Sequence, residues 1–403
     1  MSDQKYKYVI VGAGLGGASA VDGIRELDKE GSILIVGSES HLPYARPPLS
    51  KKLWVGQKEV EDIFIHDLAF YSADSNLDLV LESTITNLDA SAKTVTDSQG
   101  NTYSYEKLLL ATGGVPRMLN IPGGDLDSIY YYRYLDDFLR LKPDVQDEKP
   151  AVIIGGGFIG SEMAAALSVN KVEVTMIFPE PYLVSRVFPE SLGMAIQEEY
   201  HKRGIRILAG DVPVSIEKNG EEFITRTKNG EEIESGIVIV GAGIMPSVEL
   251  AEAAGLIIGN GVTVNEYLQT SDPDIYAVGD SAFFPYYVLG EQVRIEHWDN
   301  ALSQGKLAGR NMAGATEPFT YMPYFFSDLF DFGYEAVGDV NSSLETFMDW
   351  EKENETGVIY YLKEGKVRGA MLCNVWGKLD AARELIKKGE QVTPEDLRGV
   401  IRS

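Results

Sequence analysis

Two glycine-rich segments of the chain have the residue types and the spacing that bind the phosphates of a dinucleotide. The first reads VIVGAGLGG at residues 9–17 and the second reads VIIGGGFIG at residues 152–160. In each, an apolar strand leads into G-x-G-x-x-G and then into a helical stretch, which is the context that the motif requires. The three glycines allow a tight turn, a close approach of the backbone to a pyrophosphate, and close packing of the helix on the strand. Two copies therefore predict two nucleotide-binding units.

The motif residues that we expect to line the two phosphate sites lie at the turn and in the first helical turn of each copy. They are Gly12, Gly14, Leu15, Gly16 and Gly17 in the first copy, and Gly155, Gly156, Gly157, Phe158, Ile159 and Gly160 in the second. Each helix start also offers free backbone amides to an anion.

An acid that binds the adenosine ribose is expected about 20 residues beyond each motif. Glu180 has this position in the second unit, after the strand VEVTMIF at 172–178. Because a carboxylate there bonds a 2′-hydroxyl and repels a 2′-phosphate, the sequence predicts a preference for NADH over NADPH. Arg186 lies six residues further along a loop that we expect to be mobile, so Glu180 should dominate. In the first unit Ser38 and Glu39 share the corresponding position, and either one is a candidate for the ribose contact.

The composition of the 403 residues excludes several other classes of protein. The formal net charge is −25, with 61 acidic against 36 basic residues, which argues against nucleic-acid or anionic-membrane partners. The single Cys373 excludes a disulfide framework and a redox-active cysteine pair, and the four histidines form no metal-ligand cluster. With no apolar run of membrane-spanning length and a first strand that begins by Tyr6, we expect a cytoplasmic protein without a signal or transit peptide.

The order of the apolar strands predicts that one nucleotide-binding domain is inserted into another. The strands LLLATGG at 108–114 and IYAVGDSA at 275–282 both end at glycine turns, and the second fingerprint lies between them. After about residue 318 the pattern changes to aromatic and β-branched strands, and the turn at 363–366 predicts a hairpin.

The segment LPYARPPLSKKLW at 42–54 is the most specific string in the chain. Its prolines fix an extended entry and start a helix, so that Arg46 and Lys51 project from a rigid corner. Together with ATGGVPR at 111–117, VGD at 278–280 and SDLFDFGYEAVG at 327–338, this segment resembles the apoptosis-inducing factor family. That family is part of the superfamily of pyridine nucleotide-disulfide oxidoreductases.

The resemblance implies an α/β fold class, with two Rossmann-like three-layer nucleotide-binding domains, one inserted in the other, and an α+β C-terminal domain. The implied FAD-binding domain comprises residues 1–124 and 249–317, the NAD-binding domain residues 125–248, and the C-terminal domain residues 318–403.

The resemblance also implies roles for residues outside the two fingerprints. The implied FAD contacts are Arg46, Lys51, Arg133 and Asp280, with Glu296, His297, Trp298 and Phe326 near the flavin. The implied NAD contacts are Glu180, Arg186, Gly243, Glu335 and Asn374. The implied catalytic residues are Lys51, Glu162, Phe158 and His297. In this set Glu162 pairs with Lys51 beside the reactive flavin nitrogen, and Phe158 shields the flavin where the nicotinamide docks. Purely structural roles remain open alternatives, above all for His297.

Several departures from the family pattern limit what the resemblance implies. Phe326 stands where the family usually has tryptophan. The arginines and the acid that bridge the dimer of animal members have no counterparts at 255–272, and the long C-terminal insertion, the targeting sequence and the basic patches of those members are absent. An apoptotic or DNA-condensing role is therefore not implied, and a dimer of the animal type is not expected.

These observations together predict an FAD-dependent NADH oxidoreductase that transfers a hydride from NADH to FAD. The resemblance adds the option of a long-lived charge-transfer complex between reduced flavin and NAD⁺. Two alternatives share the same motifs: a reductase of the ferredoxin or rubredoxin type, and a non-catalytic redox sensor that recruits a partner when NADH binds. The sequence leaves the electron acceptor open among quinone, oxygen and a carrier protein.

Overall fold

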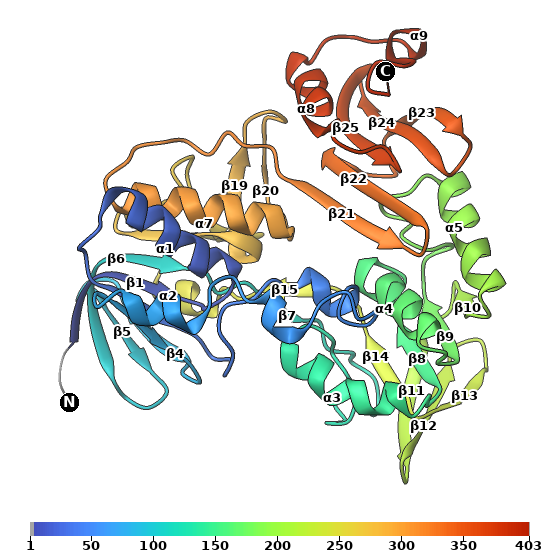
Figure 1. The fold of residues 1–403 in the computed structure, drawn as a ribbon, viewed down its shortest axis with the longest axis horizontal. Coiled ribbons are helices and arrows are strands. Elements are labelled where there is room, and N and C mark those ends of the chain that lie inside the picture. The colour runs from blue at the N-terminus through green and yellow to red at the C-terminus, as the bar shows by residue number, and fades with distance from the viewer. Residues whose placement is uncertain (1–3, 403) are drawn as a thin grey trace. The chain divides into compact units, whose positions relative to one another are not determined.

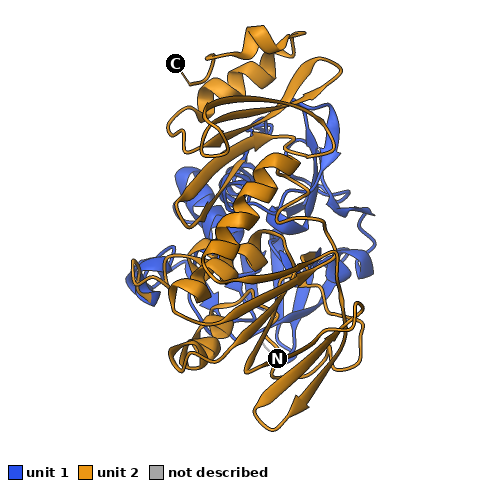
Figure 2. Cartoon of the chain, turned by 90° about the vertical axis from the view of Figure 1, so that its right-hand side faces the viewer, with its two compact units in different colours: residues 1–45, 60–115, 245–323 blue, residues 46–59, 116–244, 324–403 orange. Residues whose placement is uncertain are grey.

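The computed structural model describes residues 4–402 and divides into two compact units (Figures 1 and 2). Unit 1 comprises residues 1–45, 60–115 and 245–323, and unit 2 comprises residues 46–59, 116–244 and 324–403. Each unit is assembled from three separate segments, so the chain passes between the units several times. Two short strands, β7 (Gly114–Pro116) and β15 (Ile244–Pro246), contain two of these passages.

Unit 1 is built on a sheet in which β1 lies between β2 and β6, all three parallel. The strand β3 extends the sheet beyond β2, and β18 pairs in parallel with the end of β6. The strands of unit 1 are β1 (Gln4–Val11), β2 (Ile33–Val36), β3 (Leu77–Val80), β4 (Ile85–Asp89), β5 (Thr94–Asp97), β6 (Thr102–Leu110), β16 (Ile258–Gly259), β17 (Gly261–Thr263), β18 (Ile275–Ala277), β19 (Ala282–Tyr286) and β20 (Glu291–Val293). Strands buried on both faces need unbroken apolar runs, and β2 and β18 are such runs.

The longest helix of unit 1 packs against the helix of the first fingerprint. The helices of this unit are α1 (Leu15–Leu27), α2 (Leu68–Ala73), α6 (Glu249–Ala253) and α7 (Trp298–Met312), with the 3-10 helices η2 (Val60–Ile63) and η3 (Gly279–Ser281). Where α7 crosses α1, a Cβ on Gly305 would lie 2.3 Å from the Gly16 carbonyl oxygen. Glycine at this position therefore lets the two backbones touch, which fixes the middle of α7 against the first turn of α1.

Unit 2 contains a second parallel sheet, in the order β10-β9-β8-β14, and a separate antiparallel sheet formed by the C-terminal residues. Its strands are β8 (Ala151–Ile154), β9 (Val174–Phe178), β10 (Arg206–Ala209), β11 (Pro213–Asn219), β12 (Glu222–Thr227), β13 (Glu232–Ser235), β14 (Ile237–Val240), β21 (Tyr324–Leu329), β22 (Phe332–Gly338), β23 (Glu345–Lys352), β24 (Thr356–Lys363) and β25 (Lys366–Cys373). Its helices are η1 (Pro47–Ser50), α3 (Leu135–Gln146), α4 (Phe158–Val169), α5 (Glu190–Lys202), α8 (Leu379–Lys388) and α9 (Pro394–Leu397).

The observed elements confirm the α/β fold class, since each fingerprint joins a buried parallel strand to a helix. They also confirm the predicted hairpin, in which Lys363 pairs with Lys366 across β24 and β25. The proposed three-domain boundaries stay a prediction.

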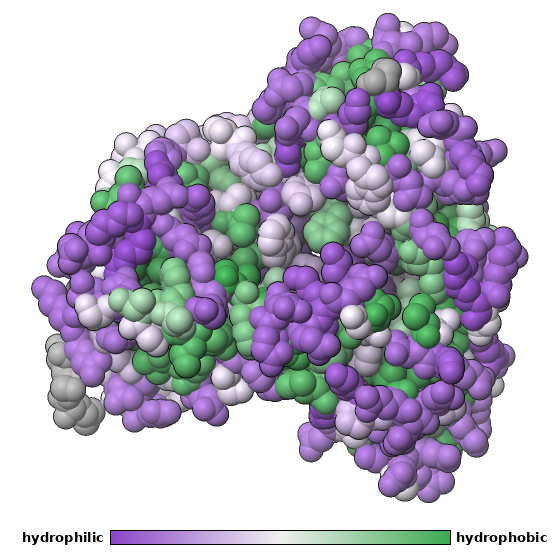
Figure 3. All heavy atoms as spheres, in the orientation of Figure 1, coloured by the Kyte–Doolittle hydropathy of each residue, from purple (hydrophilic) through white to green (hydrophobic). Residues whose placement is uncertain are grey.

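Hydrophilic residues cover much of the face shown in Figure 3, as the acidic composition leads one to expect. Among residues 4–402, no helix has both the length and the apolar character needed to cross a membrane. Within the same range, no group of histidine, cysteine, aspartate and glutamate side chains could hold a metal ion.

Candidate functional site

The first fingerprint forms a cradle of backbone that is shaped for an anion. Gly12 has a φ of +114°, and a Cβ there would lie 2.2 Å from the Ala111 carbonyl oxygen. A Cβ on Gly17 would lie 2.1 Å from the Gly12 carbonyl oxygen, so neither position accepts a side chain. Gly14 caps α1, and a Cβ there would meet nothing within 4 Å. This open space at a helix N-terminus fits a pyrophosphate.

The second fingerprint repeats this geometry in unit 2. Gly155 has a φ of +122°, and a Cβ there would lie 2.4 Å from the Gly241 carbonyl oxygen. A Cβ on Gly160 would lie 2.0 Å from the Gly155 carbonyl oxygen, whereas Gly157, the N-cap of α4, faces open space. The backbone thus fits a second dinucleotide.

The two candidate ribose acids differ in their surroundings. In unit 1 the Tyr44 hydroxyl donates a 2.5 Å hydrogen bond to Glu39 Oε2, while Ser38 is exposed. In unit 2 Glu180 is 28% exposed and Arg186 Nη2 lies 3.4 Å from its Oε1. The position of Glu39, held by a tyrosine, favours it over Ser38 as the ribose ligand of the first unit.

A buried ion pair lies at the centre of the candidate reactive site in unit 2. Lys51 Nζ is 3.0 Å from Glu162 Oε1, and the two side chains are only 11% and 6% exposed. The hydroxyl of Ser50 donates to Glu162 Oε2 and that of Ser327 donates to Oε1, each at 2.5 Å. The carboxylate therefore receives bonds from three residues on two other segments of the chain, which offsets the cost of burying both charges.

An aromatic ring lies against the lysine of this ion pair, and two further aromatic rings are paired in the same unit. Lys51 Nζ lies 4.7 Å from the centre of the Phe326 ring and donates to the Phe326 carbonyl oxygen at 3.4 Å. In the same unit the rings of Phe158 and Phe325 are 5.5 Å apart, with their planes tilted by 59°. Phe326 pairs across β21 and β22 with Glu335, whose Oε2 is buried without a hydrogen-bond partner among the described residues. Burial raises the pKa of the Glu335 carboxyl.

The two arginines that the resemblance assigns to FAD are also linked within unit 2. Arg46 precedes the proline-initiated helix η1, and its Nη1 donates to the Arg133 carbonyl oxygen at 2.8 Å. Its guanidinium lies 5.1 Å from the centre of the Tyr134 ring. The predicted helix start is confirmed by η1, which has proline at its first positions, but Arg46 before it has φ −74° and ψ −34° and is helical rather than extended, with its side chain against the segment before α3.

The Gly-Asp turn after β18 is fixed by side chains of unit 1. The Gly279 amide donates to Gln304 Oε1 at 2.8 Å, and the Asp280 carbonyl oxygen accepts from Arg294 Nη1 at 3.1 Å. The same arginine pairs with Glu296. Asp280, which the resemblance implies is an FAD contact, therefore lies in a turn whose backbone is hydrogen-bonded to the side chains of Gln304 and Arg294.

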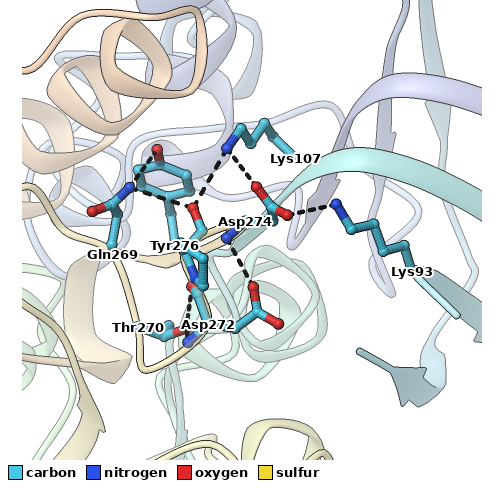
Figure 4. A network of polar contacts seen from close by, with 8 residues as sticks. Lys93, Lys107, Gln269, Thr270, Asp272, Asp274 and Tyr276 are labelled. Carbon is cyan, nitrogen blue, oxygen red and sulfur yellow. Dashed lines mark hydrogen bonds and ion pairs between the residues drawn. The ribbon is translucent and has the colours of Figure 1, made fainter. Parts of the chain in front are cut away.

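A network of polar contacts anchors the other end of β18 (Figure 4). Asp274, immediately before the strand, pairs with Lys107 at 2.6 Å and with Lys93 at 2.5 Å, both on or beside β6. Its amide donates to Asp272 Oδ1 at 2.8 Å. Opposite charges hold the pKa of the Asp274 carboxyl below its usual range. The network helps to set the register of β18 and so the place of the turn that follows.

His297 is the N-cap of α7 and is followed by Trp298 at the first helical position. Desolvation by the surrounding protein lowers the pKa of the imidazole to about 4. The Asp280 carboxylate acts in the opposite direction, and part of the side chain is accessible. The ring is therefore neutral at pH 7, so it would act as a hydrogen-bonding group rather than as a cation.

Two implied NAD contacts have structural roles in unit 2. Asn374 has a φ of +48°, and its side chain accepts from the Gly333 amide at 3.0 Å and donates to the Glu355 carbonyl oxygen at 3.1 Å. Gly243 has a φ of +86° and accepts from the Arg117 amide at 2.9 Å. Contacts from either residue to NAD remain predictions.

The sequence-predicted residues are thus divided between the units. Unit 2 brings together Lys51, Glu162 and Phe326, while unit 1 contains the first fingerprint, Asp280 and His297. Sequence reasoning missed the partners of these residues, which are Ser50, Ser327, Tyr44, Gln304 and Asp274. Tyr44 and Ser50 lie inside the proline-rich string at 42–54 and Ser327 begins the string at 327–338, whereas Gln304 and Asp274 lie in no motif that the sequence singled out.

Two family models match the chain. The model described as pyridine nucleotide-disulphide oxidoreductase matches residues 6–305. The model described as the C-terminal part of mitochondrion-associated apoptosis-inducing factor matches residues 308–356. They meet close to the start of the C-terminal segment, where the strand pattern changes.

Three relatives illustrate what the chain is similar to. Apoptosis-inducing factor 1, mitochondrial, of Dictyostelium discoideum is 35% identical over 98% of this chain and 80% of its own length. A monodehydroascorbate reductase of Solanum lycopersicum is 32% identical over 92% of each chain. Among solved structures, a ferredoxin reductase from Rhodopseudomonas palustris has a TM-score of 0.90 at 29% identity over 96% of each chain. These matches confirm the family resemblance, an FAD-dependent NAD(P)H oxidoreductase, and FAD and NAD as its cofactors.

Proposed function

Because the chain belongs to the pyridine nucleotide-disulphide oxidoreductase family, we propose that it oxidises NADH in preference to NADPH and passes the electrons to a small organic acceptor. The observation that carries the proposal is the buried pair of Lys51 and Glu162, 3.0 Å apart, with the Phe326 ring 4.7 Å from the lysine Nζ. We assign the first fingerprint to FAD and the second to NADH.

Bound FAD would supply the redox chemistry, accepting a hydride from NADH and releasing the electrons to the acceptor. Lys51 provides a fixed positive charge where negative charge develops, which is the most effective form of electrostatic assistance. Glu162 holds the ammonium in place and offsets its burial. Phe158 and Phe325 form an apolar wall that would exclude water and orient a flat nicotinamide ring.

Glu180 supports the choice of NADH. It lies two residues after the end of β9 and keeps one carboxylate oxygen, Oε2, outside its described contact with Arg186. A carboxylate at this place bonds the ribose hydroxyl of NADH and opposes the phosphate of NADPH.

The small acceptor is supported by charge and by the relatives. A chain of net charge −25 repels acidic carrier proteins, and several relatives about 32% identical are named as reductases of monodehydroascorbate, a small organic molecule. A cytoplasmic location and the absence of nucleic-acid and membrane partners complete the proposal, on the same charge and on the single buried Cys373.

The alternative is a protein carrier. A solved complex of putidaredoxin reductase with putidaredoxin has a TM-score of 0.90 at 29% identity over 98% of this chain. The same fold therefore serves a reductase that is linked to a protein partner.

The proposal is tested by anaerobic mixing of the FAD-loaded protein with NADH, followed by addition of a quinone, an ascorbyl radical source, oxygen or a ferredoxin. We expect NADH to bleach the flavin absorbance and the small acceptors to restore it in many cycles. Rapid reoxidation by the ferredoxin alone would favour the carrier alternative. A reduced protein with a long-wavelength charge-transfer band that no acceptor reoxidises quickly would indicate a sensor. Absence of bleaching by either nucleotide would refute the proposal.

A further inference from the structure

The loop at 179–189 joins β9 to α5 and carries both Glu180 and Arg186. The sequence predicts that this loop is mobile. In the structure it is instead bonded to the fingerprint at one side and to the C-terminal sheet at the other, all within unit 2. Its conformation therefore depends on residues far away in the sequence.

The first half of the loop is tied to the phosphate turn. The amide of Val184 donates to the Gly156 carbonyl oxygen at 2.8 Å, and the Glu180 carbonyl oxygen accepts from the Gly210 amide at 3.1 Å. Val184 is buried and has a φ of +54°, which is rare for a β-branched residue. A conformation of this kind persists only where the surroundings impose it, and such positions gather at binding sites.

The second half of the loop is held by residues of the C-terminal segment. The Ser342 amide donates to the Arg186 carbonyl oxygen at 3.0 Å, and the Ser342 hydroxyl donates to the Ser185 carbonyl oxygen at 2.5 Å. The Tyr361 hydroxyl, on β24, donates to the Val187 carbonyl oxygen at 2.8 Å. Three successive carbonyl groups of the loop are thus held from one side.

An aromatic contact completes this attachment. The ring of Phe188, fully buried, lies 5.4 Å from the ring of Tyr334 and 6.1 Å from that of Phe332, both on β22. The end of the loop is therefore packed as part of the core of the C-terminal sheet.

The side chain of Arg186 itself is weakly restrained. It is 87% exposed, and its described side-chain contact is the 3.4 Å approach to Glu180. An exposed ion pair of this length is weak, so the fixed backbone at 185–187 decides where the guanidinium can reach. If that backbone were released, the Arg186 guanidinium could leave Glu180 and bond a 2′-phosphate.

We propose that Ser342 and Tyr361 are positioning residues for cofactor choice: by holding the carbonyl groups of residues 185–187, they keep the Arg186 guanidinium paired with Glu180, so that it does not bond a 2′-phosphate. The inference rests on the proposed preference for NADH. It adds that this preference is set in part by the C-terminal segment, which contains neither fingerprint.

The test compares a double variant, Ser342→Ala with Tyr361→Phe, with a matched control, Ser343→Ala with Tyr360→Phe. The control removes the same groups from neighbouring positions, and Tyr360 bonds the Leu397 carbonyl oxygen instead of the loop. Calorimetric titration of the FAD-loaded proteins with NAD⁺ and with NADP⁺ gives the ratio of the two dissociation constants. We expect the preference for NAD⁺ to fall about fivefold or more in the double variant and to stay within about twofold in the control.

Amide hydrogen exchange at residues 183–188 provides a readout that needs no bound nucleotide. Exchange should be faster in the double variant than in the wild type and the control. An unchanged binding ratio, or equal exchange in all three proteins, would overturn the inference. A wild type that binds NADP⁺ as well as NAD⁺ would refute the proposed cofactor choice, and the exchange data would then decide alone whether Ser342 and Tyr361 hold the loop.

Discussion

The two fingerprints have nearly the same backbone but different side-chain surroundings. Gly12 and Gly155 share a φ close to +120°, and both face a carbonyl oxygen at a distance that no Cβ could occupy. Gly14 and Gly157 both face open space. The turn that receives a pyrophosphate is therefore specified by glycine spacing alone, which is why it is repeated so closely.

The two copies differ in the side chains that follow their glycines. Two residues after its third glycine, the first copy has the buried Ser19, whereas the second copy has Glu162, which pairs with Lys51. The acid after the second strand is held by a tyrosine in one unit and faces an exposed arginine in the other. Duplication of the fold thus gives two phosphate cradles, and the chemistry is added by side chains from other segments.

The largest effects are expected where the shared backbone is broken. Gly12→Ala and Gly155→Ala each force a Cβ against a backbone carbonyl oxygen at a positive φ, so each should lower the free energy of unfolding by about 2 kcal/mol or more. Chemical unfolding of the purified variants measures this loss. If either variant were as stable as the wild type, the turn would not need glycine, and the equivalence of the two copies would fail.

The next effect tests the ion pair with Lys51 that only the second copy makes, through Glu162. Replacing Lys51 with alanine removes the charge held by Glu162 and should slow flavin reduction by saturating NADH about a hundredfold. Stopped-flow absorbance of the anaerobic protein gives the limiting rate.

Lys51→Arg provides the control because it keeps the charge. Ser327→Ala, which removes one donor to Glu162, should have a smaller effect in the same direction. A limiting rate in Lys51→Ala equal to that of the wild type would exclude Lys51 from hydride transfer.

A smaller effect distinguishes the roles of Glu180 and Glu39, the candidate ribose ligands of the two units. Glu180→Ala should reduce the preference for NADH over NADPH by about tenfold, since a carboxylate no longer opposes the 2′-phosphate. Glu39→Ala should leave this preference unchanged and weaken FAD retention instead. Reduction rates with both nucleotides, and the flavin content after gel filtration, distinguish the two. Equal NADPH efficiency in the wild type and in Glu180→Ala would refute the assignment.

The smallest effect concerns His297, at the start of the helix that packs on α1. Its pKa is lowered to about 4, so between pH 4 and its ordinary value of about 6.5 the unfolded chain binds a proton that the folded chain does not. The free energy of unfolding therefore falls as the pH decreases through this window. Between pH 7 and 4.5 the wild type should lose about 1 kcal/mol more than His297→Gln, as measured by guanidinium unfolding at each pH. Identical losses would show that the surroundings of His297 do not lower the pKa of its imidazole.

The features that sequence predicted well are those fixed by local backbone. The glycine turns, the proline corner before Lys51 and the hairpin at 363–366 depend on φ preferences that a residue type carries with it. The preference of each buried strand for apolar residues is equally local. For this reason the fold class followed from short strings.

The features that sequence could not predict depend on contacts between distant segments. Ser327, Ser342 and Tyr361 are ordinary strand or turn residues, and no spacing marks them as partners of Glu162 or of the 179–189 loop. Asn374, predicted to contact NAD, also holds a turn through its side chain, a role that only the packed structure reveals. The family resemblance gave the positions of the candidate residues, but it did not show which other side chains hold them in place.

We have assigned the first fingerprint to FAD and the second to NADH. The most direct test measures FAD content and NADH affinity in Gly14→Ala and Gly157→Ala, whose new methyl groups meet open space and so should leave stability unchanged within about 0.5 kcal/mol. We expect Gly157→Ala to keep its FAD and lose NADH binding, and Gly14→Ala to lose FAD. A Gly157→Ala protein that loses FAD but still binds NADH would contradict this assignment.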